Sequence, residues 1–171
     1  MDKGNLVENS VSSLVDALAQ RLITKQWMAA TAESCTGGGI AAALTDLAGS
    51  SAWFDAGFIT YSNAAKQRML GVSPEHFRES GTGAVSEAVV LEMSLGAVAR
   101  SGADVSMAVS GVAGPGGGSA EKPVGTVWIA WCVEGRADAE CFLFGGDRAQ
   151  IRHATIASAL QGLVSRIDVL A

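Results

Sequence analysis

The chain has 171 residues, enough for one domain with a real hydrophobic core and too few for two comfortable ones. Its composition, 49% hydrophobic and 17% charged with a net charge of −5, is that of a globular protein and argues against a basic nucleic-acid binder. No apolar run approaches the roughly 20 residues of a membrane span, and the first residues lack the apolar segment of a signal peptide. We therefore expect a cytoplasmic protein with neither a membrane nor a nucleic-acid partner.

The cysteines and histidines do not predict a metal centre. Cys35, Cys132 and Cys141 follow no zinc-binding spacing, and an odd number of cysteines suits a reducing compartment. The only histidines are His76 and His153, and we expect both to be surface imidazoles. A site built around a metal is therefore not expected.

The first half of the chain alternates helical and strand patterns. Apolar residues at steps of three and four predict an amphipathic helix over 6–22, and a short apolar run predicts a buried strand over 28–31. A helix over 40–47 follows a glycine-rich turn. An aromatic and β-branched run predicts a strand over 53–61, and the next helix, up to residue 70, begins with Ser62 or Asn63 as its cap.

The second half continues the alternation and adds a hairpin. A loop or short helical stretch over 71–83 precedes a helix that opens at Ser86 and Glu87, and a strand over 104–109 comes next. A glycine-dense loop over 110–123 leads to two neighbouring strands, 124–133 and 137–144, and then to a final helix over 148–167 capped by Asp147. The sequence thus predicts a single α/β domain over 1–171. We expect three α/β/α layers and a mixed, mostly parallel sheet with one antiparallel hairpin.

Four polar or glycine-rich segments follow predicted strands. They are "ESCTGGG" after the first, "YSNAAK" after the second, "SGVAGPGGG" after the third and "GGDRAQIR" after the last. Ligands of open α/β sheets bind beyond the carboxyl ends of the strands. We therefore expect these segments to meet at one edge of the sheet.

The segment "ESCTGGG" has three interpretations. It matches neither a P-loop nor a dinucleotide fingerprint, because its glycines are contiguous and no Gly-Lys-Ser/Thr follows. Its small residues can bring backbone N–H groups to an anion or an oxyanion, present a nucleophile, or simply begin a helix. The segment alone leaves these alternatives open.

Two adjacent nucleophiles and one candidate base stand out. Ser34 needs a base, and Lys66 lies one helical turn beyond Tyr61, which can orient the lysine or relay a proton. The ordinary alternatives are a solvated lysine and a tyrosine packed against the core. Cys35 is the rival nucleophile, because a thiol at a helix N-terminus tends toward thiolate.

The remaining candidates would bind rather than react. Glu33 can bind a ribose hydroxyl or a lysine, or it can be a surface or helix-start charge. The loop from Ser110 offers backbone donors to a ligand, unless it is only a mobile surface loop. Arg148 and Arg152, one helical turn apart, can present guanidinium groups to a phosphate, unless Arg148 pairs with Asp147 or solvent.

Together these motifs resemble a known family. "TAESCTGG", "GSSAWFDAGFITYSNAAKQRMLGV", "GAVSE", "SGVAGPGGGSAEKPVGTVWIA" and "GDRAQIR" are similar to the C-terminal domain of the competence/damage-inducible CinA proteins, over about 6–163. The companion N-terminal domain of CinA has no counterpart here, so the chain resembles the stand-alone nicotinamide-nucleotide amidohydrolases. The resemblance implies conversion of nicotinamide mononucleotide to nicotinic acid mononucleotide and ammonia, without a metal or organic cofactor.

The resemblance also implies roles for residues. The catalytic serine falls on Ser34, and the tyrosine and lysine fall on Tyr61 and Lys66; a neutral Lys66 would take the proton of Ser34. Ser110 stands where many relatives have threonine, and it keeps the hydroxyl. The full set of expected substrate contacts is Glu33, Thr36, Gly37, Gly38, Asn63, Ser110, Gly111 and Arg148, with Arg152 less secure. Whether 36–38 or 110–111 binds the oxyanion, and which binds the phosphate, stays open.

Two other functions compete with this hypothesis. One is a nucleotide-binding regulatory module without turnover, and the other is an interaction protein in competence or DNA damage. We also expect a homo-oligomer, for which Trp53, Phe54 and Phe58 could supply an apolar patch.

Overall fold

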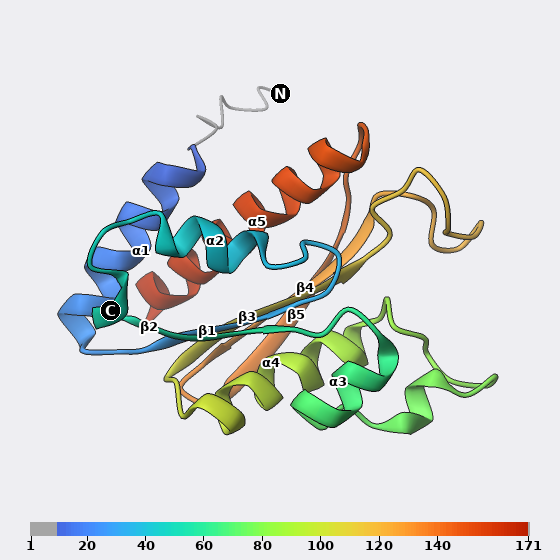
Figure 1. The fold of residues 1–171 in the computed structure, drawn as a ribbon, viewed down its shortest axis with the longest axis horizontal. Coiled ribbons are helices and arrows are strands. Elements are labelled where there is room, and N and C mark those ends of the chain that lie inside the picture. The colour runs from blue at the N-terminus through green and yellow to red at the C-terminus, as the bar shows by residue number, and fades with distance from the viewer. Residues whose placement is uncertain (1–9, 171) are drawn as a thin grey trace.

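A computed structural model describes residues 10–170 (Figure 1). The helices are α1 Val11–Lys25, α2 Gly39–Thr45, α3 Asn63–Leu70, α4 Glu87–Ser101 and α5 Arg148–Val169, with short 3₁₀ turns η1 Ser50–Ala52 and η2 Pro74–Phe77. The strands are β1 Ala29–Glu33, β2 Phe54–Ile59, β3 Val105–Gly111, β4 Thr126–Val133 and β5 Arg136–Leu143. The start of the first predicted helix, at 6–9, lies outside the described residues.

The strands form one mixed sheet in the order β2-β1-β3-β4-β5. β1 is parallel to both β2 and β3, while β4 is antiparallel to β3 and to β5. The β4–β5 hairpin is the one that the sequence predicts. The α/β class and the mixed sheet are therefore confirmed.

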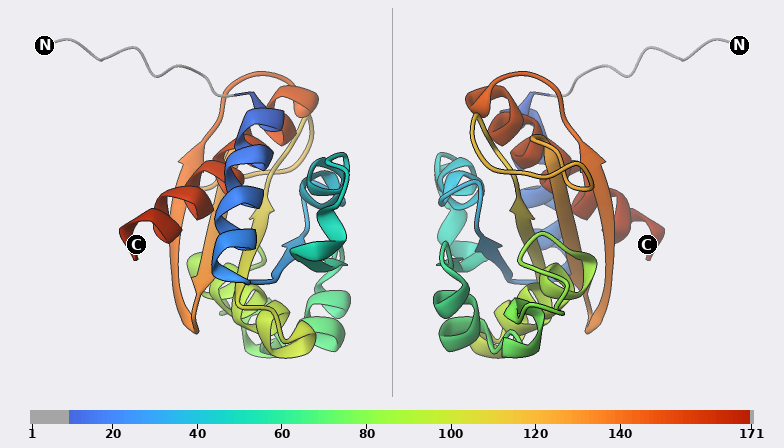
Figure 2. Two further views of the ribbon diagram at one scale, coloured as in Figure 1. Left: turned by 90° about the vertical axis from the view of Figure 1, so that its left-hand side faces the viewer. Right: turned by 90° about the vertical axis from the view of Figure 1, so that its right-hand side faces the viewer.

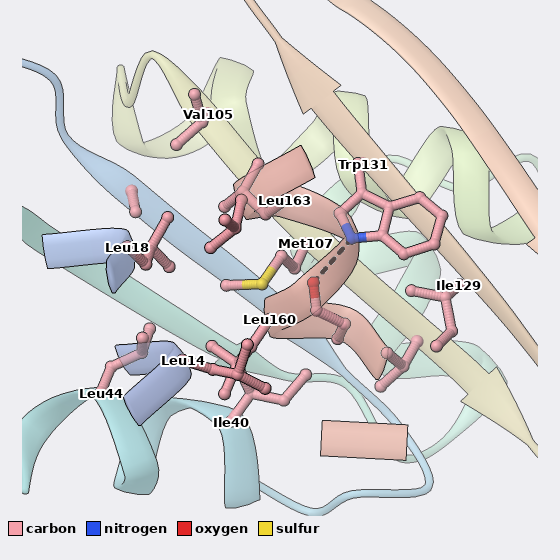
Figure 3. Close-up of a cluster of buried hydrophobic side chains, with 14 of the residues drawn as sticks. Leu14, Leu18, Ile40, Leu44, Val105, Met107, Ile129, Trp131, Leu160 and Leu163 are labelled. Atoms are coloured by element: carbon pink, nitrogen blue, oxygen red, sulfur yellow. Dashed lines mark hydrogen bonds between the residues drawn. The ribbon is translucent and has the colours of Figure 1, made fainter. Parts of the chain in front are cut away.

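Helices cover both faces of the sheet (Figures 1 and 2). α1, α2 and α5 pack on one face, where Leu18, Ile40 and Leu160 belong to the larger apolar core (Figure 3). Trp131 of β4 lies in the same core and donates its indole N–H to the carbonyl of Ala159 at 2.8 Å. α3 and α4 cover the other face, whose smaller core includes Met93. The molecule thus has the predicted three layers.

The expected apolar patch for self-association is wrong. Trp53 is 1% exposed and lies within the larger core, while Phe54 and Phe58 are half-buried against the two cores. The aromatic residues in and just before β2 serve packing, because this strand lies between the two helical layers. No helix within residues 10–170 is long and apolar enough to cross a membrane.

The connections that follow β1 and β2 cross on opposite faces of the sheet. From β1 the chain crosses through α2 to β2, and from β2 it crosses through α3 and α4 to β3, on the far side of β1. Such a divergence opens a crevice at the carboxyl ends of the central strands. The fold therefore places a ligand site beyond β1 and β3.

Candidate active site

A cavity of about 320 Å³ lies beyond the ends of these strands. Its walls come from Ser34 and Cys35 after β1, from 61–66 after β2, from the 110–118 segment at the end of β3, and from Arg148 at the start of α5. The four segments that follow predicted strands thus meet at one edge of the sheet. This is the size of a pocket for a small organic ligand.

Ser34 begins the turn that leaves β1. Its N–H donates to the carbonyl of Val109 at 3.1 Å, which ties it to the neighbouring strand. Its carbonyl accepts from the N–H of Gly37 at 3.0 Å, which closes the turn. The side chain is thereby held at the cavity wall and almost fully buried.

Lys66 is the direct partner of Ser34. Its Nζ lies 2.9 Å from Ser34 Oγ and 2.8 Å from the carbonyl oxygen of Thr60. The side chain is only 1% exposed, although it carries an amine. Helix α3 supplies this position, because the hydroxyl of Ser62 accepts from the N–H of Ala65 and starts the helix just before the lysine.

Burial prepares Lys66 to act as a base. Desolvation lowers the pKa of Lys66 from 10.5 to about 8, because burial disfavours the charged form. The carbonyls of Thr60 and Tyr61, at 2.8 and 3.4 Å from Nζ, can only accept hydrogen bonds. When the amine is neutral, they take its two N–H bonds and leave its lone pair directed at Ser34 Oγ.

Cys35 lacks the environment of a nucleophile. Its side chain packs with the apolar core, and desolvation raises the pKa of the thiol to about 11. The thiol is therefore protonated near neutral pH. The helix N-terminus that was expected to favour a thiolate does not offset this burial.

The hydroxyl of Tyr61 contacts Arg148 and not Lys66. Its side chain is 63% exposed, and its hydroxyl accepts a hydrogen bond from Nη2 of Arg148 at 3.3 Å. Only its backbone carbonyl approaches Lys66. The expected orienting role of the Tyr61 hydroxyl is therefore corrected, because the strand ends with this side chain directed to the cavity rim.

Glu33 is a structural residue in place of the expected substrate contact. Its carboxylate is 0% exposed and lies outside the cavity wall. It accepts from the hydroxyls of Thr31 and Thr36, and from the N–H groups of Ile40 and Ala41 at 2.8 and 2.9 Å. A buried carboxylate with four donors caps α2 from inside the fold and has no free lone pair for a ribose.

The contiguous glycines also serve packing. Thr36, Gly37 and Gly38, expected as substrate contacts, are not part of the cavity wall. Gly38 has φ +97°, and a Cβ there would lie 2.9 Å from the side chain of Ile59 in β2. A Cβ at Gly39 would lie 2.7 Å from Ile156 in α5. These glycines let the start of α2 approach its neighbours closely.

The second glycine segment forms a cavity wall rich in backbone donors. Within the described range, the N–H groups of Ala113, Gly114 and 116–118 donate to no other residue, and all of these residues line the cavity. Gly114, Gly117 and Gly118 have positive φ, which side chains rarely tolerate. Successive free N–H groups in such a loop make an anion-binding surface.

Of the two arginines, Arg148 lies at the cavity. Its Nη1 donates to the carbonyl of Gly114 at 2.7 Å, so it also holds the glycine loop. Arg152 lies outside the cavity wall and donates from Nη2 to the carbonyl of Thr36 at 2.9 Å. Asp147, predicted as the cap, accepts from the N–H of Gln150 in a capping box, which fixes the start of α5.

Three of the other expected contacts also line the cavity. Asn63 is exposed at its mouth, while Ser110 and Gly111 form the end of β3. The hydroxyl of Ser110 donates to the carbonyl of Ala84 at 2.8 Å. It can therefore still accept a hydrogen bond from a ligand.

One wall was missed by sequence reasoning. Ala84 and Val85 line the cavity, although they precede a helix and carry no reactive group. The hydroxyl of Thr82, just before this wall, shares a hydrogen bond with Nδ1 of His76 at 3.1 Å.

The same histidine is held on its other side, where Nε2 lies 2.9 Å from Oε1 of Glu92. His76 is thus largely buried, and the expectation of a surface imidazole is wrong for it. Only His153 is exposed.

Comparison with known proteins identifies close relatives. Residues 11–167 match the family described as the CinA C-terminal domain. A protein of Pseudomonas putida named nicotinamide-nucleotide amidohydrolase PncC is 52% identical over 154 residues, with 90% of this chain and 95% of the relative covered. A protein of Escherichia coli K12 with the same name is 48% identical over 161 residues, with 92% of this chain and 95% of the relative covered.

Solved structures agree with the fold. A crystal structure of the competence damage-inducible protein A from Klebsiella pneumoniae is 41% identical, with a TM-score of 0.89. The match covers 94% of this chain and 98% of that one. The three-layer architecture is therefore shared with a solved protein over nearly its whole length.

Proposed function

Because this chain belongs to the CinA C-terminal domain family, we propose that it hydrolyses the carboxamide of nicotinamide mononucleotide, releasing nicotinic acid mononucleotide and ammonia. The names of the similar amidohydrolases support the reaction. The observation that carries the proposal is the 2.9 Å contact between Lys66 Nζ and Ser34 Oγ inside a buried cavity wall.

In the first step, neutral Lys66 takes the proton of Ser34 while Oγ attacks the carboxamide carbon. The carbonyl oxygen becomes an oxyanion in a tetrahedral intermediate. As the C–N bond breaks, the ammonium of Lys66 returns its proton to the leaving nitrogen, which departs as ammonia. An ester between Ser34 and the nicotinoyl group remains.

In the second step, a water molecule is the nucleophile. Neutral Lys66 removes a proton from the water as it attacks the ester carbon, and the same proton then passes to Ser34 Oγ as the ester breaks. The new carboxylic acid gives up its remaining proton to solvent, nicotinic acid mononucleotide leaves as the carboxylate, and the Ser34–Lys66 pair is restored. One buried amine with a pKa of about 8 can serve both steps, because it is readily protonated and deprotonated near neutral pH.

The phosphate belongs at the second glycine segment. The free N–H groups of Ala113, Gly114 and 116–118 and the guanidinium of Arg148 form the cationic and donor-rich part of the cavity wall. Asn63 and Ser110 are the proposed polar contacts to the rest of the nucleotide. This arrangement supports a phosphate site at 110–118 and an oxyanion site at the turn that carries Ser34.

An ammonia-release assay tests the function. The purified chain is mixed with nicotinamide, its riboside, its mononucleotide or the dinucleotide, and ammonia is measured over time. We expect ammonia from the mononucleotide and much less from nicotinamide and the riboside, which lack the phosphate. Binding of the mononucleotide without ammonia would instead support the regulatory module. Neither binding nor ammonia would leave the competence-related interaction protein as the better hypothesis.

A further inference from the structure

Arg152 reaches from α5 to the turn that carries the nucleophile. Its Nη2 donates to the carbonyl of Thr36 at 2.9 Å, across 116 positions of sequence. The side chain is half-buried and is not part of the cavity wall. This arginine therefore does not provide a phosphate contact. Its one described hydrogen bond is to the backbone of the turn.

The contacted peptide is held at both of its ends. Its carbonyl, from Thr36, accepts from Arg152, and its N–H, from Gly37, donates to the carbonyl of Ser34 at 3.0 Å. Polarisation of the carbonyl by a guanidinium strengthens the N–H at the other end as a donor. Arg152 thus acts on the nucleophile's own carbonyl through a single peptide group.

The carbonyl of Ser34 and the N–H of Cys35 belong to one planar peptide. Fixing the carbonyl therefore fixes the direction of the N–H. This N–H donates to no other residue among 10–170, its only recorded acceptor is the residue's own sulfur, and Cys35 is part of the cavity wall. The N–H of the residue after a nucleophile is a recurrent oxyanion donor.

Glu33 fixes the same turn from the opposite side. Its carboxylate accepts from the hydroxyl of Thr36 at 2.6 Å, while Arg152 contacts the carbonyl of that residue. Thr36 is therefore clamped between a buried anion and a cation from another helix. The turn has few ways to rotate the next peptide out of place.

We propose that Arg152 is a positioning residue that orients the Cys35 N–H toward the oxyanion, through the peptide between Thr36 and Gly37. The inference rests on the proposed amide hydrolysis at Ser34. On this proposal Arg152 stabilises the transition state, in which the oxyanion is present, and contributes nothing to the affinity for the substrate.

The test compares kcat and KM for nicotinamide mononucleotide in Arg152→Ala, Arg152→Lys and the wild type. We expect Arg152→Ala to lower kcat about 10- to 100-fold with KM within about twofold, less than loss of an oxyanion donor itself. Arg152→Lys should recover part of the loss. Guanidinium chloride at low millimolar concentration should raise the kcat of Arg152→Ala, because a free guanidinium can occupy the vacated place.

Three controls separate positioning from folding and from substrate binding. His153→Ala removes an exposed neighbour on the same helix and should leave both constants unchanged. Titration with nicotinic acid mononucleotide should give one site per chain in Arg152→Ala with unaltered affinity, so a lower kcat cannot come from unfolded protein. Arg148→Ala should show the opposite pattern, a raised KM, because it lies at the cavity.

An unchanged kcat in Arg152→Ala, or a loss confined to KM, overturns the inference while leaving the proposed function intact. Loss of product-binding sites in proportion to kcat would also overturn it, by showing a purely structural role. If the wild type releases no ammonia from the mononucleotide, the proposed function fails and this inference fails with it.

Discussion

At the scale of single residues, Lys66 carries most of the proposed chemistry. Its amine is buried beside Ser34, and its other near partners are two backbone carbonyls. Desolvation lowers its pKa to about 8. A base must be neutral to act, so activity should follow the deprotonated fraction of this group.

The pH dependence follows directly. We expect kcat/KM for nicotinamide mononucleotide to rise about tenfold per pH unit below a pKa near 8 and to level off above it, since one proton must leave Lys66. Initial rates between about pH 6.5 and 9.5 measure this, a range chosen above the second phosphate pKa of about 6. A profile that falls as pH rises through 8 would contradict Lys66 as the base.

The lowered pKa of Lys66 should also make the free energy of unfolding depend on pH. In the unfolded chain Lys66 has its ordinary pKa of 10.5, so between about pH 8 and 10.5 the unfolded state binds more protons than the folded state. The free energy of unfolding therefore rises with pH in this window, by at most about 1.4 kcal/mol per unit from this group. Urea unfolding of the wild type and of Lys66→Met at pH 8 and 9.5 isolates the contribution of this lysine. We expect the free energy of unfolding of the wild type to rise, relative to that of the variant, between pH 8 and pH 9.5.

The sequence patterns predict the pair of Ser34 and Lys66 well, and they predict the roles of the neighbouring residues less well. Ser34 and Lys66 stand out because a hydroxyl and an amine follow two adjacent strands, and the structure brings them together. The sequence does not decide between the alternatives for Glu33 and Tyr61, because their side-chain directions depend on how α2 and α5 pack over the strand ends. Such packing involves contacts between distant segments, as in the bond from Arg148 to Tyr61.

At the scale of elements, helix α2 depends on a cap from outside its own sequence neighbourhood. The helix spans only Gly39–Thr45, and its flanking Gly38 supplies no side-chain cap. The carboxylate of Glu33, at the end of β1, accepts from two of its first N–H groups. Strand and helix thus share one buried anion.

Replacement of that anion should be costly. We expect Glu33→Gln to lower the free energy of unfolding by about 2–4 kcal/mol, because an amide loses charge-assisted bonds and sets a donor against backbone donors. Urea unfolding measures the loss. Asp55→Asn, which changes an exposed acid on the neighbouring strand in the same way, is the matched control and should stay within about 0.5 kcal/mol of the wild type. Equal stabilities for the two variants would contradict the capping role.

Element types and order could be predicted from periodicity, because apolar spacing reflects which face each segment buries. The predicted helices and strands all have counterparts among residues 10–170. Their ends differ by a few residues. For example, β1 continues to Glu33 because both neighbouring strands pair with it that far, which is a property of the sheet and not of the segment.

At the scale of the whole molecule, the site exists because β2 and β3 flank β1 in parallel, so the carboxyl ends of all three strands lie at one edge of the sheet. Ser34 and Cys35, the start of α3, the glycine loop and the start of α5 then meet over the central strands. The convergence was predictable from the rule for α/β sheets. The division of labour between the two glycine segments was not, because it depends on which backbone N–H groups the folded chain leaves free.

The most direct test of the central claim is ammonia release from nicotinamide mononucleotide by the wild type, Ser34→Ala and Cys35→Ala, measured side by side. We predict that Ser34→Ala loses activity by at least about a thousandfold, because the nucleophile is gone. Cys35→Ala should stay within about tenfold of the wild type, because its thiol is buried and protonated while its N–H remains. An active Ser34→Ala together with an inactive Cys35→Ala would contradict the account.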